Sequence, residues 1–194
     1  MIQFSLITPS LQRESLVRCC DSINAQTYSS GWQHIVALDC PTEDINHELL
    51  ARIQHPQRIV FCCGQRFGNF GNHARWMAWK YAKGDYLLGC DDDNSLYTDH
   101  ALADIAAALE SAALPAFAIF PIHRHGRWFF HDPPGTCMTD TMNVVARREI
   151  GRWPDIVTRE ADGHWVERMK LNHNYVVFPD VEPIGMMEKS SDGI

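Results

Sequence analysis

The stretch "GDYLLGCDDDNS", residues 84–95, decides the fold because it joins a short apolar run to three consecutive aspartates. Residues 85–90 have the length and composition of a buried strand. If the extended geometry persists for two more residues, Asp91 and Asp93 point to the same side, roughly 7 Å apart along the backbone. Two charges at that separation repel by on the order of 2 kcal/mol at an effective dielectric near 20. The run therefore predicts a functional site rather than a stabilising feature.

Three resolutions of this repulsion stay open: a bound divalent cation, a raised carboxyl pKa, or a solvated Asp-Asn-Ser turn. A calcium loop of the EF-hand type is excluded, because its sixth and twelfth positions need Gly and Glu but here are Leu96 and Leu102. A haloacid-dehalogenase-like, Mg-dependent phosphatase stays as an alternative, with Asp91 as nucleophile and Asp93 as general acid. Such phosphatases also need a lysine and a pair of acidic residues later in the chain, and these are not evident in the sequence.

The residues before this stretch alternate between strand and helix patterns. Residues 2–8 predict a strand, and Leu16, Cys19, Cys20 and Ile23 recur at helical spacing. The alternation continues with a strand at 34–39, a helix at 44–54, a strand at 58–63 and a helix through 74–81. Apolar strands separated by amphipathic helices predict an α/β fold, with a mostly parallel central sheet flanked by helices.

The residues after the aspartates continue the same pattern. A helix is expected around Leu102–Leu109 and another at 160–171, with strands at 116–122, 142–147 and 174–179. The stretch "HRHGRWFFHDPPGT", residues 123–136, predicts a loop or hairpin over one end of the sheet. The sequence contains no repeat or linker, which predicts one domain over residues 1–194.

Composition narrows the classes of partner. The chain is 45% hydrophobic and 21% charged, as expected of a globular protein, and its net charge of -7 argues against nucleic acid as a partner. Seven cysteines without a C-x-x-C spacing predict buried thiols in a reducing compartment. No signal peptide and no apolar run of about 18 residues is evident. We expect a cytoplasmic protein without a transmembrane segment, with peripheral membrane docking as an alternative.

In order and spacing, these segments resemble the inverting family two glycosyltransferases, which are nucleotide-sugar enzymes of the GT-A fold. "FSLITPSLQRESLVRCCDSINAQTY" (4–28) is similar to that family's first strand, T-P turn and helix. "WQHIVALD" (32–39) is similar to its second strand with a terminal acid. "GNHARWMAWKYAKGDYLLGCDDDN" (71–94) is similar to its helix, G-D-Y, apolar strand and D-x-D motif. The resemblance implies a single Rossmann-like GT-A domain, with a nucleotide-binding half (1–95) and an acceptor-side half (96–194).

The resemblance also implies which residues bind the donor. The nucleotide-binding set is Thr8, Pro9, Asp39, Arg75, Asp91 and Asp92, and Asp91 with Asp93 would hold the Mn or Mg ion that bridges the donor diphosphate. Of the three aspartates, Asp92 is expected to matter least for activity. By residue type alone, Asp39 could be a turn former and Arg75 a solvated helix residue.

A base is needed to take the proton of the acceptor hydroxyl if the sugar carbon is inverted by direct displacement. "ADGHWVERM" (161–169) is similar to the family's E-D-x-x-x-x-x-R segment, which makes Asp162 the base and Arg168 the arginine. Ala161 replaces the first acid of that motif. The alternative for Asp162 is a helix N-cap.

Two further segments leave alternatives open. The C-terminal "VEPIGMMEKSSDGI" lacks the His that many relatives use as a metal ligand, so His173 or a residue of 123–131 would have to substitute. In that loop His123, His125 and His131 are ordinary polar residues or a zinc site. Its aromatic residues, Trp128, Phe129 and Phe130, either stack on an acceptor sugar or pack on the core. The glycine-rich residues 64–72 are expected to form a flexible connection into the next helix.

Taken together, the sequence predicts a metal-assisted, inverting glycosyltransferase. It would move a sugar from a nucleotide-diphospho-sugar to the hydroxyl of a sugar, lipid-linked or other acceptor. A non-catalytic GT-A-like domain that binds nucleotide or sugar is the second alternative, encouraged by Ala161. A homo-oligomer is compatible with this reading.

Overall fold

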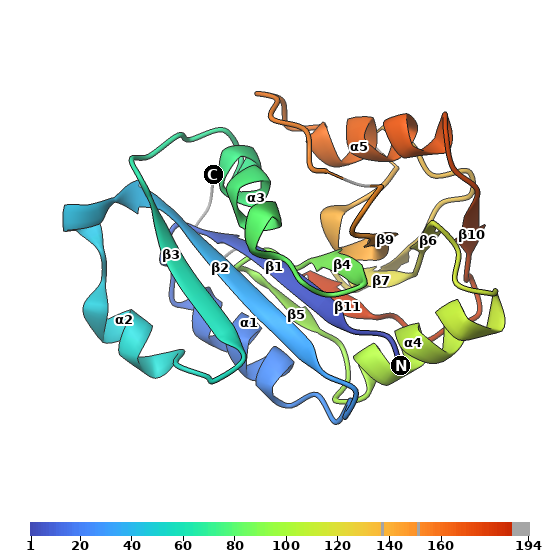
Figure 1. Ribbon diagram of the computed structural model, residues 1–194, viewed down its shortest axis with the longest axis horizontal. Helices are drawn as coiled ribbons and strands as arrows, with labels where there is room; N and C mark the ends of the chain where they lie inside the picture. Colours follow the sequence, from blue (N-terminus) through green and yellow to red (C-terminus); the bar gives the residue numbers. More distant parts are fainter. Residues whose placement is uncertain (137, 151, 188–194) are drawn as a thin grey trace.

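The computed structural model describes residues 1–136, 138–150 and 152–187, and its centre is a seven-stranded sheet in the order β10-β6-β9-β4-β1-β2-β3 (Figure 1). Its strands are β1 (Phe4–Ser10), β2 (Trp32–Pro41), β3 (Arg58–Gly64), β4 (Tyr86–Gly89), β6 (Phe117–Ile119), β9 (Val144–Arg147) and β10 (Tyr175–Val177). The helices are α1 (Ser15–Asn24), α2 (His47–Arg52), α3 (Asn72–Ala78), α4 (Ala101–Ser111) and α5 (Ala161–Lys170). Short 3-10 turns span Thr42–Asp44, Trp79–Tyr81 and Thr141–Asn143. None of the described helices is long and apolar enough to cross a bilayer.

The sheet is largely parallel, as predicted, with one reversed strand. β1 pairs in parallel with both β2 and β4, β2 pairs in parallel with β3, and β10 pairs in parallel with β6. β9 runs antiparallel to both of its neighbours, β4 and β6. It enters the sheet from the Thr141–Asn143 turn rather than from a helical crossover, and only crossovers return a strand in the parallel direction.

β1 continues two residues beyond its predicted end, through Pro9. Proline lacks the N–H that a central strand donates to the ladder. The pairing of β1 with β4 ends at Ile7, opposite Gly89, so Pro9 lies where that neighbour has already turned away. On this side the end of β1 contacts the aspartate segment that follows β4 instead of a paired strand.

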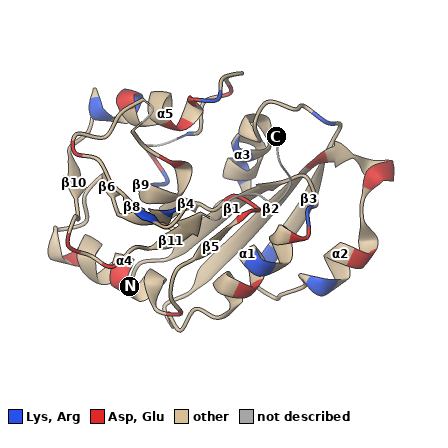
Figure 2. Ribbon diagram, turned by 180° about the vertical axis from the view of Figure 1, so that it is seen from behind, with Lys and Arg blue, Asp and Glu red and all other residues tan. Residues whose placement is uncertain are grey.

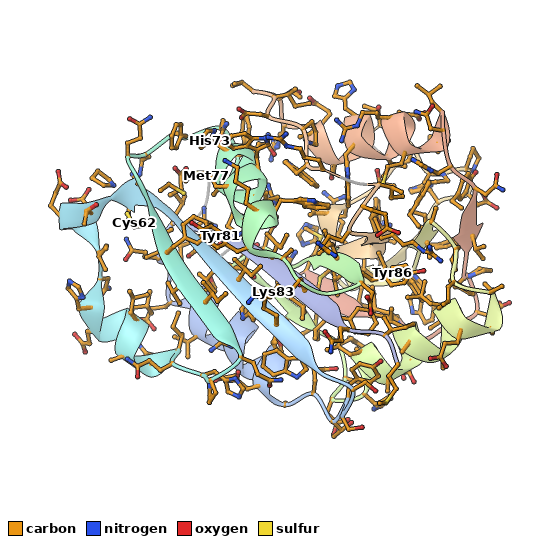
Figure 3. The ribbon with its side chains drawn as sticks, viewed as in Figure 1. Cys62, His73, Met77, Tyr81, Lys83 and Tyr86 are labelled. Atoms are coloured by element: carbon orange, nitrogen blue, oxygen red, sulfur yellow. The ribbon has the colours of Figure 1, made fainter. Side chains whose placement is uncertain are left out.

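Helices cover both faces of the sheet (Figure 1). The predicted apolar stripe of α1, formed by Leu16, Cys19, Cys20 and Ile23, is fully buried. α4 packs on the same side through Leu102, Ile105 and Leu109. α3 and α5 cover the other face, where the Trp79 and Trp165 rings meet edge to face at 5.9 Å. In Figure 3 the labelled His73, Met77 and Tyr81 follow α3 and its 3-10 extension over that face.

A second sheet, in the order β5-β11-β7-β8, was not predicted. Its strands are β5 (Asn94–Leu96), β7 (Ile122–Arg124), β8 (Arg127–Phe129) and β11 (Gly185–Met187). The single strand predicted at 116–122 is wrong: it divides at Phe120 and Pro121 into β6 of the main sheet and β7 of the second. The predicted loop or hairpin is a hairpin, β7–β8, whose turn residues His125 and Gly126 have φ of 50° and 82°.

The six cysteines in the described part of the chain are free thiols, while Cys137 lies outside it. Cys19, Cys20, Cys40 and Cys90 are buried, as predicted. Burial raises the pKa of Cys20 to about 12, so this thiol stays protonated and packs as a small apolar side chain.

Candidate active site

A pocket of about 400 Å³ opens where the turn after β4 meets α3, β7 and the start of α5. Asp91, Arg75 and Asp162 all line it. In α/β folds, ligands bind outside the carboxyl ends of the parallel strands, and Asp91 follows the carboxyl end of β4. The pocket therefore joins two predicted site residues, Asp91 and Asp162, that are 71 positions apart in the sequence.

The three aspartates do not continue the strand as the alternation argument assumed. β4 ends at Gly89, and the Asn94 amide donates to the Asp91 carbonyl at 2.9 Å, which closes a turn over residues 91–94. The prediction that extended geometry places Asp91 and Asp93 on one side is therefore wrong. Asp91 instead pairs with Arg75, whereas Asp93 lies 3.5 Å from Arg13.

Asp92 holds the turn in place. Its side chain is buried, and its Oδ2 accepts hydrogen bonds from the Ser10 hydroxyl at 2.8 Å and the Leu11 amide at 3.1 Å. Burial raises the pKa of this carboxyl to about 6. Asp92 does not line the pocket, so its contacts are those of a residue that fastens the turn to the end of β1.

Arg75 is buried, so the interpretation of a solvated helix residue is wrong. Its guanidinium donates to the Asp91 carboxylate and, at 2.8 Å, to the Phe70 carbonyl. It also lies 5.2 Å from the centre of the Trp153 ring. These contacts fix the guanidinium between the glycine-rich segment and the aspartate turn, where it orients Asp91.

Asp39 organises the glycine-rich segment. Its two carboxylate oxygens accept hydrogen bonds from the Phe67 amide at 2.7 Å and the Gly68 amide at 3.1 Å. The segment expected to be a flexible connection is thus tied to the carboxyl end of β2. Asp39 is buried and does not itself line the pocket.

Thr8 and Pro9 hold the end of β1 against the same region. The Thr8 hydroxyl donates to the Cys90 carbonyl at 2.6 Å and meets the His34 Nε2 at 2.9 Å. Gly71 has φ +74°, and a Cβ built on it would lie 2.8 Å from the Pro9 Cβ. Only glycine fits at this close approach, so Pro9 sets the path of the chain into α3.

Asp162 lies in the first turn of α5, half-buried at the pocket wall. The N-cap of this helix is Glu160, so the interpretation of Asp162 as N-cap is wrong. Its Oδ1 accepts a hydrogen bond from the Gly163 amide at 2.7 Å. Burial raises the pKa of Asp162. Arg168, in the last turn of the same helix, donates to the Arg152 carbonyl and does not line the pocket.

Sequence reasoning missed four charged residues of the pocket: Arg124, Asp140, Arg159 and Glu160. Burial and the nearby charge of Asp91 raise the pKa of Asp140 to about 7, and its Oδ1 accepts from the Met142 amide at 3.0 Å. Asp140 caps the Thr141–Asn143 turn, so "DTMN" is a local cap signal that could have drawn attention to it. No local sequence signal marks Arg124 or Arg159 as a pocket residue.

The aspartates offer hard carboxylate oxygens, which suit Mn or Mg. Burial and, after it, the negative charge of Asp91 raise the pKa of Asp93. In the described part of the chain, however, the one compact group of potential metal ligands is His100, Asp104 and Glu182, outside the pocket. Asp91 lines the pocket and Asp93 does not, so these two aspartates fit a metal by the chemistry of their oxygens alone.

The predicted substitute ligands lie elsewhere. His123 stacks on Tyr97 with ring centres 5.8 Å apart, and His131 meets the Phe129 ring at 5.1 Å. Neither these two residues nor His125 and His173 line the pocket. Phe129 and Phe130 pack against buried clusters, whereas the Trp128 side chain is 62% exposed. The C-terminal residues 188–194 lie outside the described part of the chain.

Residues 5–174 match the family described as Glycosyl transferase family 2, which covers most of the chain. The protein therefore belongs to glycosyltransferase family 2, as predicted, and the phosphatase alternative is excluded. A comparison with curated protein sequences gives no significant match.

Solved structures identify the fold as GT-A. Staphylococcus aureus TarS 1–349 in complex with UDP-GlcNAc superposes with a TM-score of 0.80 over 99% of this chain and 60% of that one, at 19% identity. The mannosyltransferase PcManGT from Pyrobaculum calidifontis, in complex with GDP-Man and Mn2+, gives a TM-score of 0.70 over 98% of this chain and 58% of that one, at 18% identity. The present chain thus spans about 60% of the length of these structures.

Proposed function

We propose that this protein is an inverting glycosyltransferase that moves a sugar from a nucleotide-diphospho-sugar to an acceptor hydroxyl, assisted by Mn or Mg. One observation carries the proposal: Asp91, from the aspartate turn, and Asp162, at the start of α5, line a single pocket. A donor bound at the first residue would present its sugar toward the second.

The nucleotide would occupy the end of the sheet formed by Thr8, Pro9 and Asp39, next to the glycine-rich segment. In support, the two family neighbours described above bind UDP-GlcNAc and GDP-Man. The Asp39 and Arg75 hydrogen bonds hold this segment in one conformation before any ligand arrives. A preformed site loses less conformational entropy on binding.

Asp91 and Asp93 would hold the metal ion, which, when bound, stabilises the charge that develops on the departing diphosphate. Arg75 would keep the Asp91 carboxylate oriented toward the pocket. The neighbour PcManGT was solved with Mn2+. Asp92, although placed with the nucleotide-binding residues by resemblance, would act through the position of the turn.

Asp162 would be the base that accepts the proton of the acceptor hydroxyl. Displacement with inversion requires a base on the face of the sugar away from the leaving group, and Asp162 lines the same pocket as Asp91. Burial raises the pKa of Asp162, which increases its proton affinity. Ala161 leaves the position before it without an acid, so Asp162 would work without a second carboxylate there.

The nucleotide half (1–95) and acceptor half (96–194) would act as one domain in a cytoplasmic enzyme, with a sugar, a lipid-linked hydroxyl or another hydroxyl as acceptor. Ligand-induced thermal stabilisation tests the donor site, because a ligand that binds the native state raises the melting temperature. UDP, GDP, UDP-GlcNAc and GDP-Man are compared with and without Mn2+, in the wild type and in Asp93→Asn. We expect a metal-dependent rise in the wild type that Asp93→Asn removes. No response to any of them would contradict the proposal.

A further inference from the structure

The β7–β8 hairpin places two arginines opposite each other. Arg124 of β7 and Arg127 of β8 are cross-strand partners on either side of the two-residue turn. Like charges in directly opposed positions destabilise a sheet. Figure 2, in which Lys and Arg are blue, shows blue ribbon at β8. The hairpin thus concentrates positive charge in a protein whose net charge is -7.

A third arginine, Arg159, lines the same pocket as Arg124 and lies three residues before Asp162 in the chain. Within residues 1–136, 138–150 and 152–187, none of these three arginines has a carboxylate within 4.0 Å. In contrast, Arg13, Arg52, Arg75 and Arg147 each pair with an acid. Five other arginines also have no carboxylate in that range within the same residues: Arg58, Arg66, Arg148, Arg152 and Arg168. Of all the arginines without such a partner there, Arg124 and Arg159 are the two that line the pocket.

The pocket does contain carboxylates, but each is hydrogen-bonded to another group. Asp91, Asp140, Glu160 and Asp162 accept from Arg75, the Met142 amide, the Thr158 hydroxyl and the Gly163 amide, respectively. Arg124 influences Asp140 only at longer range, by lowering its pKa. The guanidinium groups of Arg124 and Arg159 thus remain available to a ligand.

The position of these groups indicates which substrate they meet. Arg75 belongs to the donor side, where Asp91 neutralises it. Arg159 precedes the proposed base on the chain, and Arg124 lies in the acceptor-side half, half-buried, with its guanidinium 5.0 Å from the Phe129 ring. The planar donors of a guanidinium match the oxygens of a phosphate or carboxylate.

We propose that Arg124 and Arg159 bind an oxyanion, a phosphate or a carboxylate, carried by the acceptor near its reacting hydroxyl. The inference rests on the proposed function and specifies its acceptor class. The exposed Arg127 and Trp128, farther along the hairpin, would contact the next unit of a longer acceptor. The acceptor is therefore a hydroxyl compound that carries a negative charge, rather than a neutral sugar.

Isothermal titration calorimetry tests this with three small polyols: glycerol 1-phosphate, glycerate and glycerol. We expect the protein to bind at least one of the two anions about tenfold or more tightly than glycerol, with the stronger one identifying the oxyanion. Arg124→Gln and Arg159→Gln should each remove that preference. Arg52→Gln is the matched control, because Arg52 is an exposed arginine of α2 that pairs with Glu14. This variant should bind the three polyols as the wild type does. Arg159 is exposed, so its variant keeps the test open if Arg124→Gln fails to fold.

The same set of variants would reveal two other ligands for these arginines: the donor diphosphate and a membrane surface. If the arginine variants weaken UDP or GDP binding in Mn2+ as much as polyol binding, the arginines hold the donor diphosphate and the inference is wrong. If Arg127→Gln abolishes binding to phosphatidylserine vesicles while no anionic polyol is preferred, the hairpin docks on membranes and the inference is wrong. Loss of all nucleotide binding in the wild type would instead contradict the proposed function.

Discussion

Arg75 donates a hydrogen bond to Asp91 while holding the Phe70 carbonyl, so one buried guanidinium joins the glycine-rich segment to the aspartate turn. The pair connects α3 to the residue that follows β4, two elements that flank the end of β1. The orientation of Asp91 therefore depends on a residue 16 positions earlier in the chain.

Replacing Arg75 by Met should weaken both stability and donor binding. The substitution keeps an apolar stem but removes hydrogen bonds to a charged partner, which predicts a loss of about 1.5–3 kcal/mol in the free energy of unfolding. Urea denaturation measures this loss, and titration with UDP or GDP in Mn2+ measures binding. Arg75→Lys keeps the charge but loses the planar guanidinium and its fixed set of donors. It should therefore recover part of the stability and little of the nucleotide affinity. Wild-type affinity in Arg75→Met would contradict the role given to the pair.

The structure separates Asp92 from Asp93. Asp92→Ala removes the acceptor for Ser10 and Leu11, and should lower the free energy of unfolding by about 1–3 kcal/mol. Asp93→Ala removes a half-buried carboxylate and should leave stability nearly unchanged while reducing Mn2+ affinity. Urea denaturation without metal and calorimetric titration with Mn2+ measure the two effects. Equal destabilisation by both variants would show that Asp92 does not fasten the turn.

Gly71 should be the least replaceable glycine of the segment before α3. Gly68→Ala and Gly71→Ala both place a side chain at positive φ, which costs about 1–2 kcal/mol. Only Gly71→Ala adds a close contact with Pro9, and overpacking of that kind costs roughly 1–3 kcal/mol more. Denaturation of the two variants isolates the contact, since Gly68 has open space around its Cβ position. Equal losses would contradict the close approach.

Asp140 predicts a pH dependence of stability in the metal-free protein. Burial raises its pKa in the folded state to about 7, above the ordinary value of 3.8, so the folded state binds this proton more tightly than the unfolded state. Its contribution to the free energy of unfolding should therefore fall as the pH rises from about 4 to about 7. Urea denaturation across that range, with EDTA present, should show a smaller decline in Asp140→Asn. The same slope in both proteins would contradict the raised pKa.

Most of the main sheet could be predicted because its strands and helices carry distinct apolar periods. The stripe of α1 and the apolar run of β4 are examples. The direction of β9 could not be predicted, since its period of two is the same in parallel and antiparallel strands. β5 and β11 have three residues each and pair across about 90 positions, so they have no local signature.

The site could be predicted where the resemblance to family two glycosyltransferases indicated which distant residues act together. Residues Asp91, Arg75 and Asp162 were all selected from the sequence, and the structure brings them to one pocket. The mutual arrangement of Asp91 and Asp93 could not be predicted, because the turn closed by Asn94 replaces the extended geometry. Arg124 and Arg159 were missed because only the tertiary fold brings the hairpin and the start of α5 to one pocket.

The most direct test of the account compares Asp162→Asn with Asp180→Asn, which alters an exposed carboxylate after β10. Sugar transfer and donor hydrolysis are measured with UDP-GlcNAc and GDP-Man, alongside nucleotide binding in Mn2+. We predict that Asp162→Asn lowers turnover by 100-fold or more, on the order of the contribution of a general base, with binding unchanged. Asp180→Asn should match the wild type. Equal turnover in Asp162→Asn and the wild type, with nucleotide still bound, would contradict the assignment of Asp162 as the base.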